Sequence, residues 1–469
     1  MRYKVAIVGA GPGGAVLARN LARRGIEVVI YEKGTYDTLG HDWSDAVERV
    51  ALRATGLEMP VLEGSEWKGR LVKDNPDGEG VFERHAFPQL KIFSPDYTSV
   101  KEIDFLMITT DRRKLGQLLI EEAENAGAEI KYRHEGLGLL YKETGIDGPS
   151  GVEVQGVKVR NLKTGEEEEV KADVVVESSG FHSTLRTSLP LHTGLAYHFN
   201  EEDFGFVNRE VRRRDPEMAK KDIVPDHYRY GFHMGYQWSH VHSEERIDVG
   251  AGVKNIPQNP DPKDLIEEFI SRHPSISDQK IRGGRGACIV GPPLSNFVAN
   301  GFLVIGDAAS TSVPTTGCGA GSAMLVGLWA SEVLAEAAEE NRNDIEKLWD
   351  INKKFYLDNE RGASFAALAA LRTVLQNIGH EDLGFLFRQE IMDARTLENS
   401  INGIFAPPEI ETKIKSLLRG VSKPLILTKL DQAISKGQKI HKHYRNYPPC
   451  WDPKEFAKWK AEADKLMSF

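Results

Sequence analysis

A mixed α/β (α+β) fold with an inserted antiparallel sheet and a C-terminal helical region is predicted by three features of the sequence. The chain opens with an apolar strand, a glycine-rich turn and a helix, an order typical of parallel α/β units. Strand-like segments such as Gly80–Phe87, Gly194–Phe199 and Arg246–Val253 dominate the middle of the chain. From about residue 346 the apolar residues recur at helical spacing instead, as in Ser364–Ile378.

Length and composition are those of an ordinary globular protein. The chain has 469 residues, of which 40% are hydrophobic and 28% charged, and its length suggests about three structural units. A net charge of −9 argues against a nucleic-acid binder, which needs a basic surface. The sequence has no apolar run of about 18 residues that could span a bilayer, no signal-peptide pattern and only three cysteines. We therefore expect a cytoplasmic protein.

The N-terminal segment has the pattern of a dinucleotide-binding unit. A strand at Tyr3–Val8 leads through a glycine-rich turn into a helix at Ala15–Arg24, and a second strand, Glu27–Tyr31, ends at Glu32. A GxGxxG turn in this setting is a much stronger signal than the same glycines elsewhere. We interpret the unit as a dinucleotide site.

Each glycine of this turn has a physical role. Gly9 permits the tight turn, Gly11 lets the backbone approach a pyrophosphate, and Gly14 allows close packing of the helix on the strand. The helix N-terminus offers free N–H groups and the positive end of its dipole to the diphosphate. Glu32 is spaced to accept hydrogen bonds from ribose hydroxyls.

A second glycine-rich turn occurs late in the chain. The buried strand Phe302–Ile305 runs into Gly306 and Asp307, and a long helix follows at Ser322–Glu339. Between them lies a turn containing Pro314, Gly317, Gly319 and Gly321. An aspartate at the end of a strand can hold a ribityl hydroxyl, and such a turn can support a flavin ring on its backbone amides.

Two more segments complete a recognisable set. Asp173–Ser183 reads as a strand that ends in a glycine turn, and Thr110–Leu115 opens a helix. Together the four segments resemble the FAD-dependent oxidoreductases of the para-hydroxybenzoate-hydroxylase-like fold. Gly306-Asp307 matches the GD motif of that fold, and Ser179-Gly180 is a degenerate form of its DG motif. The resemblance implies a Rossmann-type FAD-binding domain with an inserted antiparallel substrate-binding sheet.

FAD is the cofactor that the resemblance implies. The sequence has no second GxGxxG unit, so the electron donor, NAD(P)H or a ferredoxin-like protein, is expected to bind transiently. The residues expected to bind FAD are Gly9, Gly11, Gly13, Gly14, Glu32, Lys33, Asp45, Arg112, Gly306, Asp307, Pro314, Gly317, Gly319 and Ala320.

A narrower resemblance covers most of the chain. The segments Val174–Pro190, Gly235–Gly252, Gly301–Gly327 and Pro424–Pro448 are similar to the geranylgeranyl reductase family. Those flavoenzymes saturate isolated C=C bonds of polyprenyl chains. The resemblance implies a reductase of a hydrophobic, isoprenoid substrate, with an appended C-terminal helical domain.

Two motifs of that family are altered in this chain. In the family's Tyr-x-Trp-x-Phe-Pro motif, Tyr236 and Trp238 are present, but His240 and the residue after it replace Phe and Pro. In its Pro-Cys-Gly-Asp segment only Asp45 is present, and Trp43 stands where the family has cysteine. Both differences fall where the resemblance places the chemistry.

The altered motif supplies the candidate catalytic residues. Tyr236, Trp238, His240 and His242 alternate along a predicted strand and should share one face. We expect Tyr236 or His240 to donate a proton to the substrate, and Trp43 to stack near the flavin or line the substrate cavity. The alternative is an aromatic strand that simply packs within the sheet. No carboxylate is spaced to complete a metal site with these histidines.

The expected domain boundaries follow from the resemblance. The FAD-binding domain is discontinuous, at 1–60, 101–190 and 281–340; the substrate-binding sheet uses 61–100 and 191–280; the helical domain covers 346–469. Within the last, Lys429–His443 is a basic helix that can either lie on an anionic membrane surface or face solvent.

Three functions remain open from the sequence. The first is reduction of C=C bonds in a geranylgeranyl-type substrate. The second is a flavin-dependent monooxygenase that hydroxylates an aromatic group on a small molecule or peptide. The third is a non-enzymatic escort protein on the same fold. The Trp-x-Trp-x-Ile-Pro segment of flavin halogenases is absent.

Overall fold

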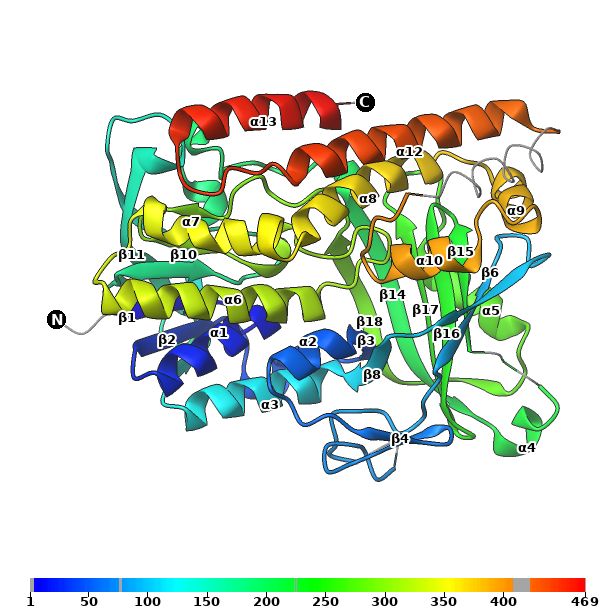
Figure 1. The fold of residues 1–469 in the computed structure, drawn as a ribbon. Coiled ribbons are helices and arrows are strands. Elements are labelled where there is room, and N and C mark those ends of the chain that lie inside the picture. The colour runs from blue at the N-terminus through cyan, green and yellow to red at the C-terminus, as the bar shows by residue number, and fades with distance from the viewer. Residues whose placement is uncertain (1–3, 76–77, 223, 225, 408–421, 469) are drawn as a thin grey trace.

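Six strands form a mostly parallel sheet at one end of the molecule, on the left in Figure 1. The computed structural model describes residues 4–75, 78–222, 224, 226–407 and 422–468. The strand order is β19 (Val298–Ala299), β20 (Phe302–Val304), β13 (Val174–Glu177), β1 (Lys4–Val8), β2 (Glu27–Glu32) and β9 (Glu129–Tyr132). Only the β19–β20 pair is antiparallel. The central strands are runs of Val, Ile and Ala that are buried on both faces, as parallel sheets require.

Three helices pack on this sheet. They are α1 (Pro12–Arg23), α3 (Arg112–Asn125) and α6 (Ala320–Glu339). Helices α1 and α6 cross closely, because a Cβ at Gly327 would lie only 2.2 Å from the Gly13 carbonyl oxygen. Asp111 caps α3 by accepting hydrogen bonds from the N–H groups of Arg113 and Lys114.

A small three-stranded antiparallel sheet leans on the parallel sheet. It consists of β10 (His134–Glu143), β11 (Val152–Asn161) and β12 (Glu167–Lys171). Close contact is possible at Gly136, where a Cβ would lie 2.7 Å from a methyl carbon of Val8. The glutamates of β12 are exposed, as expected for a solvated hairpin.

A seven-stranded sheet forms the other half of the molecule. Its order is β18 (Ile276–Ile289), β14 (Phe204–Arg214), β17 (Arg246–Lys254), β16 (Gly235–Ser243), β15 (His227–Phe232), β6 (Gln89–Phe93) and β7 (Val100–Asp104). All neighbours are antiparallel except β15 and β6. Helix α5 (Pro262–Ser271) packs on β17 through Leu265, Ile266 and Phe269, which join a small hydrophobic core.

The remaining short elements are β3 (Ser44–Glu48), α2 (Arg49–Ala54), β4 (Val61–Glu63), β5 (Glu66–Lys68) and β8 (Met107–Asp111), which precede α3 in the chain, and α4 (Pro216–Ala219), which follows β14. Strands β3 and β8 pair with each other and lie beside the start of α3.

Of the three strand-like segments predicted for the middle of the chain, two are wrong. Arg246–Val253 is confirmed as β17. Gly80–Phe87 makes only isolated bridges, because Phe82 and His85 pair with different partners. Gly194–Phe199 is irregular, since Gly194 ends a helical turn at φ +71° and the backbone carbonyls beyond it bind the Arg186 guanidinium. The expected boundary at 280/281 falls inside β18.

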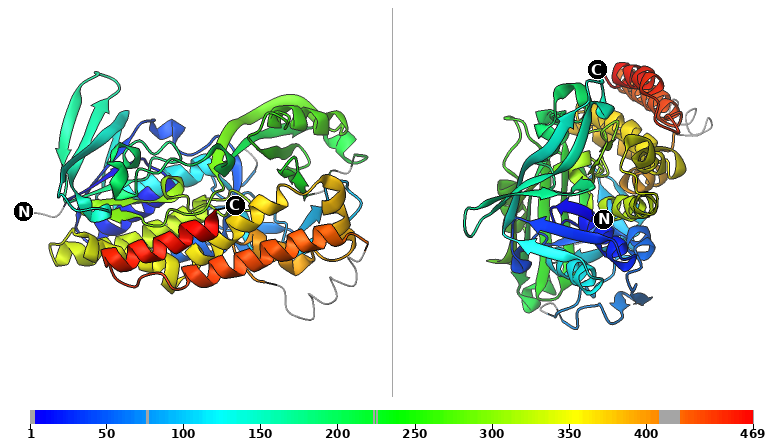
Figure 2. Two further views of the ribbon diagram at one scale, coloured as in Figure 1. Left: turned by 90° about the horizontal axis from the view of Figure 1, so that it is seen from above. Right: turned by 90° about the vertical axis from the view of Figure 1, so that its left-hand side faces the viewer.

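The C-terminal helices run along one side of both halves (Figures 1 and 2). They are α7 (Ile345–Lys353), α8 (Arg361–Leu375), α9 (His380–Arg388), α10 (Ala394–Ile401), α12 (Pro424–Tyr444) and α13 (Pro453–Met467), with a π-helical turn at Lys354–Asp358. Helix α8 joins the core of the parallel sheet, whereas α9 and α10 pack with β6 and β7. Within the described ranges, no helix is long and apolar enough to cross a membrane.

Aromatic side chains fasten the last helices in place. The Tyr356 and Tyr447 rings stack at 4.3 Å, and Trp459 lies 4.7 Å from Tyr447.

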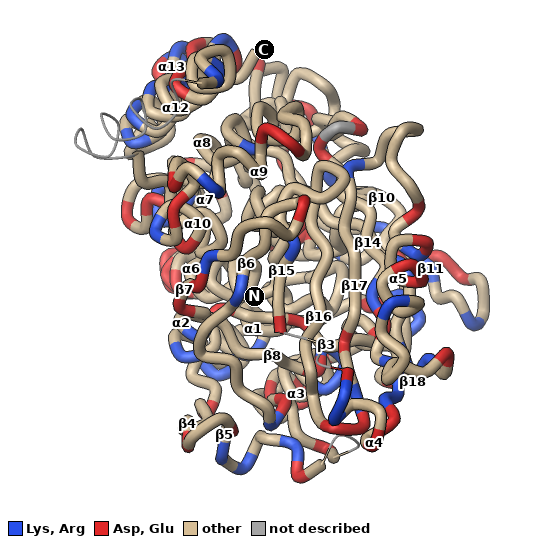
Figure 3. The backbone as a smooth tube through the Cα atoms, turned by 90° about the vertical axis from the view of Figure 1, so that its right-hand side faces the viewer, with Lys and Arg blue, Asp and Glu red and all other residues tan. Residues whose placement is uncertain are grey.

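Positive and negative residues are interspersed over the side shown in Figure 3 rather than gathered by sign. This distribution matches the mixed charge of the sequence.

Candidate functional site

One cavity of about 850 Å³ lies between the two large sheets and is closed on one side by α8. Its wall includes the turn after β1, residues 306–307 and 314–320, strands β14–β17 and the first residue of α3. The carboxyl ends of β1, β2, β13 and β20 face it, which is where ligands bind in open α/β sheets.

The turn between β1 and α1 requires its glycines. Gly9 has φ +98°, and a Cβ there would lie 2.3 Å from the Ser178 carbonyl oxygen. Gly11 and Gly13 line the cavity, and Gly11 is the N-cap of α1. Gly14 lies behind them and donates its N–H to the Ser178 hydroxyl at 3.2 Å. Gly14 therefore packs α1 against β13 and does not line the cavity.

Glu32 is held rigidly at the end of β2. Its Oε2 accepts the Ala10 N–H at 2.8 Å, and its Oε1 accepts the Gly34 N–H at 2.6 Å. The carboxylate lines the cavity and retains acceptor capacity for a ribose. Lys33, the next residue, has an exposed side chain that pairs with Glu135 at 2.6 Å. Lys33, like Gly14, is outside the cavity wall, although the sequence predicts that both bind FAD.

The turn at Ser178–Gly180 also lines the cavity. Glu177, at the end of β13, organises it by accepting the Ser179 hydroxyl at 2.8 Å and two backbone N–H groups further along. Gly180 has φ +80°, a conformation that glycine adopts readily. The degenerate motif thus keeps the turn without an aspartate in it.

Asp307 sits under a tight glycine turn at the opposite side of the cavity. It accepts the Ser312 hydroxyl at 2.8 Å, and burial raises the pKa of its carboxyl. A Cβ at Gly319 would lie 2.8 Å from Asp307 Oδ1, so the lack of a side chain there gives the carboxylate its room. The turn that follows lines the cavity with Pro314, Gly317, Gly319 and Ala320.

Arg112 carries the clearest sign of a missing ligand. It is the first residue of α3, lines the cavity and is 8% exposed. Its Nε and Nη1 are buried, and among the described residues neither has a hydrogen-bond partner. Such orphaned donors are costly unless a ligand satisfies them. Because Arg112 lines the same cavity as the N-terminus of α1, these donors fit the diphosphate of FAD.

A buried ion triad lies beneath the aromatic strand β16. Arg209 Nη1 lies 2.9 Å from Asp45 Oδ1, and Arg209 Nη2 lies 2.7 Å from Asp248 Oδ2. The two carboxylates raise the pKa of Arg209 against the opposing effect of burial. Both Asp45 and Arg209 line the cavity. The sequence does not predict Arg209, because its partners are 39 and 164 residues away.

Tyr236 and Trp238 line the cavity, whereas His240 does not. The Tyr236 hydroxyl donates to the Thr316 carbonyl oxygen at 2.5 Å, which ties β16 to the glycine turn. The His240 ring is fully buried, 4.7 Å from the Phe87 ring, and neither of its nitrogens has a partner among the described residues. Burial holds the pKa of His240 well below its ordinary value. His240 is therefore a neutral ring behind the wall.

Trp43 forms part of the wall next to Arg112. Its ring stacks on the His41 ring at 4.2 Å with an angle of 7°. Burial, aided by Arg112, lowers the pKa of His41 to about 4, so the stacked imidazole is neutral at pH 7. Gly286 on β18 gives the Trp43 ring its space, since a Cβ there would lie 2.7 Å from it.

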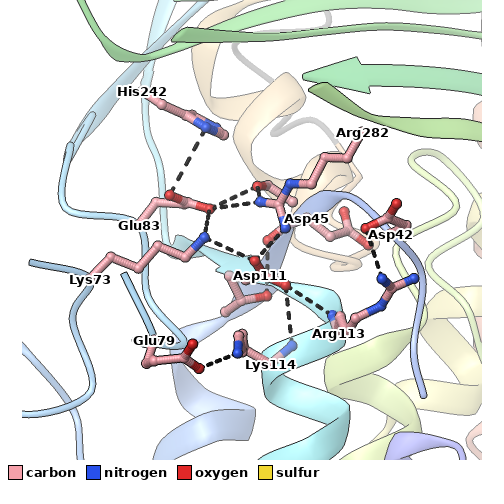
Figure 4. A network of polar contacts seen from close by, with 12 residues as sticks. Asp42, Asp45, Lys73, Glu79, Glu83, Asp111, Arg113, Lys114, His242 and Arg282 are labelled. Carbon is pink, nitrogen blue, oxygen red and sulfur yellow. Dashed lines mark hydrogen bonds and ion pairs between the residues drawn. The ribbon is translucent and has the colours of Figure 1, made fainter. Parts of the chain in front are cut away.

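A buried charge cluster fixes the start of α3 to the seven-stranded sheet (Figure 4). Lys73 Nζ lies 2.9 Å from Asp111 Oδ2 and 3.2 Å from Glu83 Oε1. Arg282 on β18 contacts both carboxylates. Burial alone would raise the pKa of Asp111, but Lys73 and Arg282 lower it to about 2. Because Asp111 also caps α3, this cluster positions Arg112.

A second cavity of about 630 Å³ lies between α8, α10 and α12. It shares Tyr230 and Leu375 with the first cavity. Most of its wall is aliphatic or aromatic, including Leu368, Leu371 and Phe405. The two cavities therefore share one wall, and the second has the more apolar lining.

The histidines of the seven-stranded sheet do not converge. The described part of the chain contains no group of three or more His, Cys, Asp or Glu residues that could hold a metal ion. His227 contacts the Ser239 hydroxyl at 2.8 Å, and His242 lies 4.0 Å from Glu83.

Family models match the two regions that contribute most of the cavity wall. A model described as FAD binding domain matches residues 104–344, and one described as NAD(P)-binding Rossmann-like domain matches residues 7–51. The first covers more than half of the chain.

Curated relatives match over most or all of the chain. Digeranylgeranylglycerophospholipid reductase of Sulfolobus acidocaldarius is 25% identical over 477 residues, with 100% of this chain and 98% of the relative covered. The enzyme of the same name from Methanothrix thermoacetophila is 27% identical, with 76% and 83% covered.

Solved structures share the fold. A geranylgeranyl bacteriochlorophyll reductase-like protein from Thermoplasma acidophilum has a TM-score of 0.68 at 20% identity, with 92% of this chain and 99% of that chain covered. A flavin-dependent brominase has a TM-score of 0.56 at 16% identity, with 99% and 100% covered. The comparisons confirm the predicted fold class and FAD as the cofactor.

Proposed function

The chain belongs to the FAD-binding-domain family and to the geranylgeranyl reductase family of FAD-dependent oxidoreductases, and on that premise we propose that it saturates C=C bonds in the chains of an isoprenoid lipid. The observation that carries this proposal is the junction of the two cavities at Tyr230 and Leu375. A cofactor cavity that adjoins a second, more apolar cavity, here called the apolar chamber, suits a long hydrocarbon substrate.

The residues of the first cavity suit FAD along its whole length. The Gly9–Gly13 turn and Arg112 would hold the diphosphate, and Glu32 the ribose. Asp307 and the turn after it would hold the flavin end. When bound and reduced, the cofactor supplies a hydride to the substrate.

The chain's own residues shape the space for the reacting double bond. Trp43, Tyr236 and Trp238 give it flat aromatic walls that exclude water. The hydrogen bond from Tyr236 to Thr316 keeps one wall in register with the glycine turn. Asp45 and Asp248 hold Arg209 against the Trp238 ring, 5.1 Å from its centroid.

The apolar chamber would receive the rest of the lipid. Leu425, at the start of α12, is 80% exposed, and Ile404, in the chamber wall, is 49% exposed. Lys429, Lys439 and Lys442 lie further along α12. Exposed apolar residues beside a basic helix suit peripheral contact with an anionic membrane surface. Contact there would let a lipid chain enter without crossing water.

The electron donor would bind transiently. The single dinucleotide-type turn of the sequence serves FAD, and so NAD(P)H or a ferredoxin-like protein would reduce the cofactor from outside this site.

Anaerobic single-turnover chemistry tests the proposal. Photoreduced protein would be mixed with a digeranylgeranyl glycerophospholipid while the flavin absorption is followed. Return of the oxidised spectrum, with one H₂ gained per saturated double bond by mass spectrometry, is expected. A flavin that stays bleached until air is admitted would reject the reductase and favour the monooxygenase, and a colourless protein would favour the escort function.

A further inference from the structure

Reduction of an alkene needs a proton as well as a hydride, and the structure restricts which side chain can donate it. Tyr236 uses its hydroxyl hydrogen on the Thr316 carbonyl oxygen. His240 lies outside the cavity and is held neutral. Trp238 is 4% exposed and presents its ring, not an acidic group. Neither proton donor expected from the sequence is free at the cavity.

Tyr228 is another residue of the cavity wall that could donate this proton. It lies on β15, directly opposite Trp238 of β16, and its ring lines the cavity. Its centroid is 5.3 Å from those of Tyr236 and His240, with both pairs edge to face. Among the described residues, its hydroxyl makes no hydrogen bond. Tyr228 is therefore a phenol in the aromatic wall whose O–H remains available to a ligand.

We infer that Tyr228 is the catalytic proton donor for the second carbon of the double bond, an inference that rests on the proposed function. The π bond breaks as one carbon takes a hydride from the reduced cofactor and the other takes the Tyr228 hydroxyl proton. Two C–H bonds form, the Tyr228 O–H bond breaks, and the phenolate regains a proton from water. The alkene is reduced and the cofactor is oxidised.

The surroundings of Tyr228 suit this role. Burial, together with Cys318, Asp45 and Asp248, raises the pKa of its hydroxyl well above the ordinary value, so the proton is retained at neutral pH. Arg209 lies close enough to oppose that shift and would stabilise the phenolate as it forms. The matched contacts of Arg209 with Asp45 and Asp248 keep this cation in place.

Tyr228→Phe tests the assignment, with Tyr97→Phe as the matched control. Tyr97 is 40% exposed and lies outside the cavity wall. In the anaerobic single turnover, Y228F should reoxidise its flavin at least about 100-fold more slowly than wild type, the scale of a lost general acid. Y97F should match wild type. Equal rates for Y228F and wild type would overturn the inference while leaving the reductase function intact.

Binding to the oxidised protein supplies a second readout that does not depend on turnover. An epoxide of the polyprenyl lipid places an oxygen acceptor where the double bond lies, and the saturated lipid lacks it. Wild type and Y97F should bind the epoxide about three- to tenfold more tightly than the saturated lipid, which is the effect expected of one hydrogen bond. Y228F should bind the two lipids equally. Loss of flavin or of saturated-lipid binding in Y228F would show a structural role and overturn the inference.

Discussion

The guanidinium of Arg209 lies 5.1 Å from the centroid of the Trp238 ring and is clamped by two carboxylates from different parts of the chain. Asp248 is fully buried, and Asp45 faces the cavity. This relationship makes the aromatic wall depend on an ion triad rather than on packing alone.

Removing the central cation should destabilise the fold. Arg209→Met leaves Asp45 and Asp248 without a counter-charge, and we expect a loss of about 3 to 5 kcal/mol in the free energy of unfolding. Urea denaturation of the holoprotein measures it. Arg285→Met is the control, because that side chain is 69% exposed and should change stability by less than about 0.5 kcal/mol. Similar losses in both variants would contradict the prediction.

Arg112 should contribute directly to cofactor affinity. Arg112→Met removes donors that are buried and unpaired among the described residues, and we expect FAD to bind about 10- to 100-fold more weakly. Titration of flavin-free protein, followed by quenching of flavin fluorescence, measures the change. Lys33→Met tests the prediction from the sequence that Lys33 binds FAD. This change should alter FAD affinity less than about twofold, because Lys33 pairs with Glu135 outside the cavity wall. The opposite ranking would reject this placement of the diphosphate.

The Asp111 cluster should make stability depend on pH. The folded pKa of Asp111 is about 2, below its ordinary value, so its contribution is complete at neutral pH and is lost as the pH falls from about 4 to 2. The pKa shift corresponds to about 2.5 kcal/mol. The free energies of unfolding of wild type and Asp111→Asn, measured by urea denaturation, should therefore differ most at pH 7 and become similar toward pH 2. A gap that is constant over this range would show that Asp111 has no shifted pKa.

The size of the side chain at residue 375 should limit the length of the prenyl chain that the site accepts. Leu375→Trp places a bulky ring where the two cavities meet. We expect kcat/KM for a digeranylgeranyl lipid to fall at least about tenfold relative to that for a short prenyl lipid, whose chain stays in the first cavity. Leu191→Trp, at a site 81% exposed, should leave the ratio unchanged. If the ratio of the two kcat/KM values is unchanged in Leu375→Trp, the lipid chain does not enter the apolar chamber during the reaction.

Parts of the site are local in the sequence and could be predicted there. Gly9 follows the end of β1 and Gly319 is the N-cap of α6, and at both positions the glycine in the sequence marks a close approach of the backbone. The same locality explains why β1, α1 and β2 are found within two or three residues of their expected bounds.

Other predictions needed contacts between distant segments. Gly80–Phe87 has the composition of a strand. Its residues nevertheless make isolated bridges to three separate neighbours, and so the segment does not form a strand. His240 alternates with Tyr236 and Trp238 as expected, but Phe87 and Tyr228 cover its ring and remove it from the cavity. Alternation specifies which face a side chain takes and not what covers that face.

The sequence by itself determined the nucleotide-binding turns, the family and the helical end of the chain, because these depend on spacing within short segments. Only the tertiary structure decided the chemistry of the cavity wall. Tyr228, Arg209 and Asp248 lie on three strands whose register brings them together, and Gly250 leaves the space that the Trp238 ring fills. Register is set by the packing of the whole sheet, and so no local pattern of residues reports it.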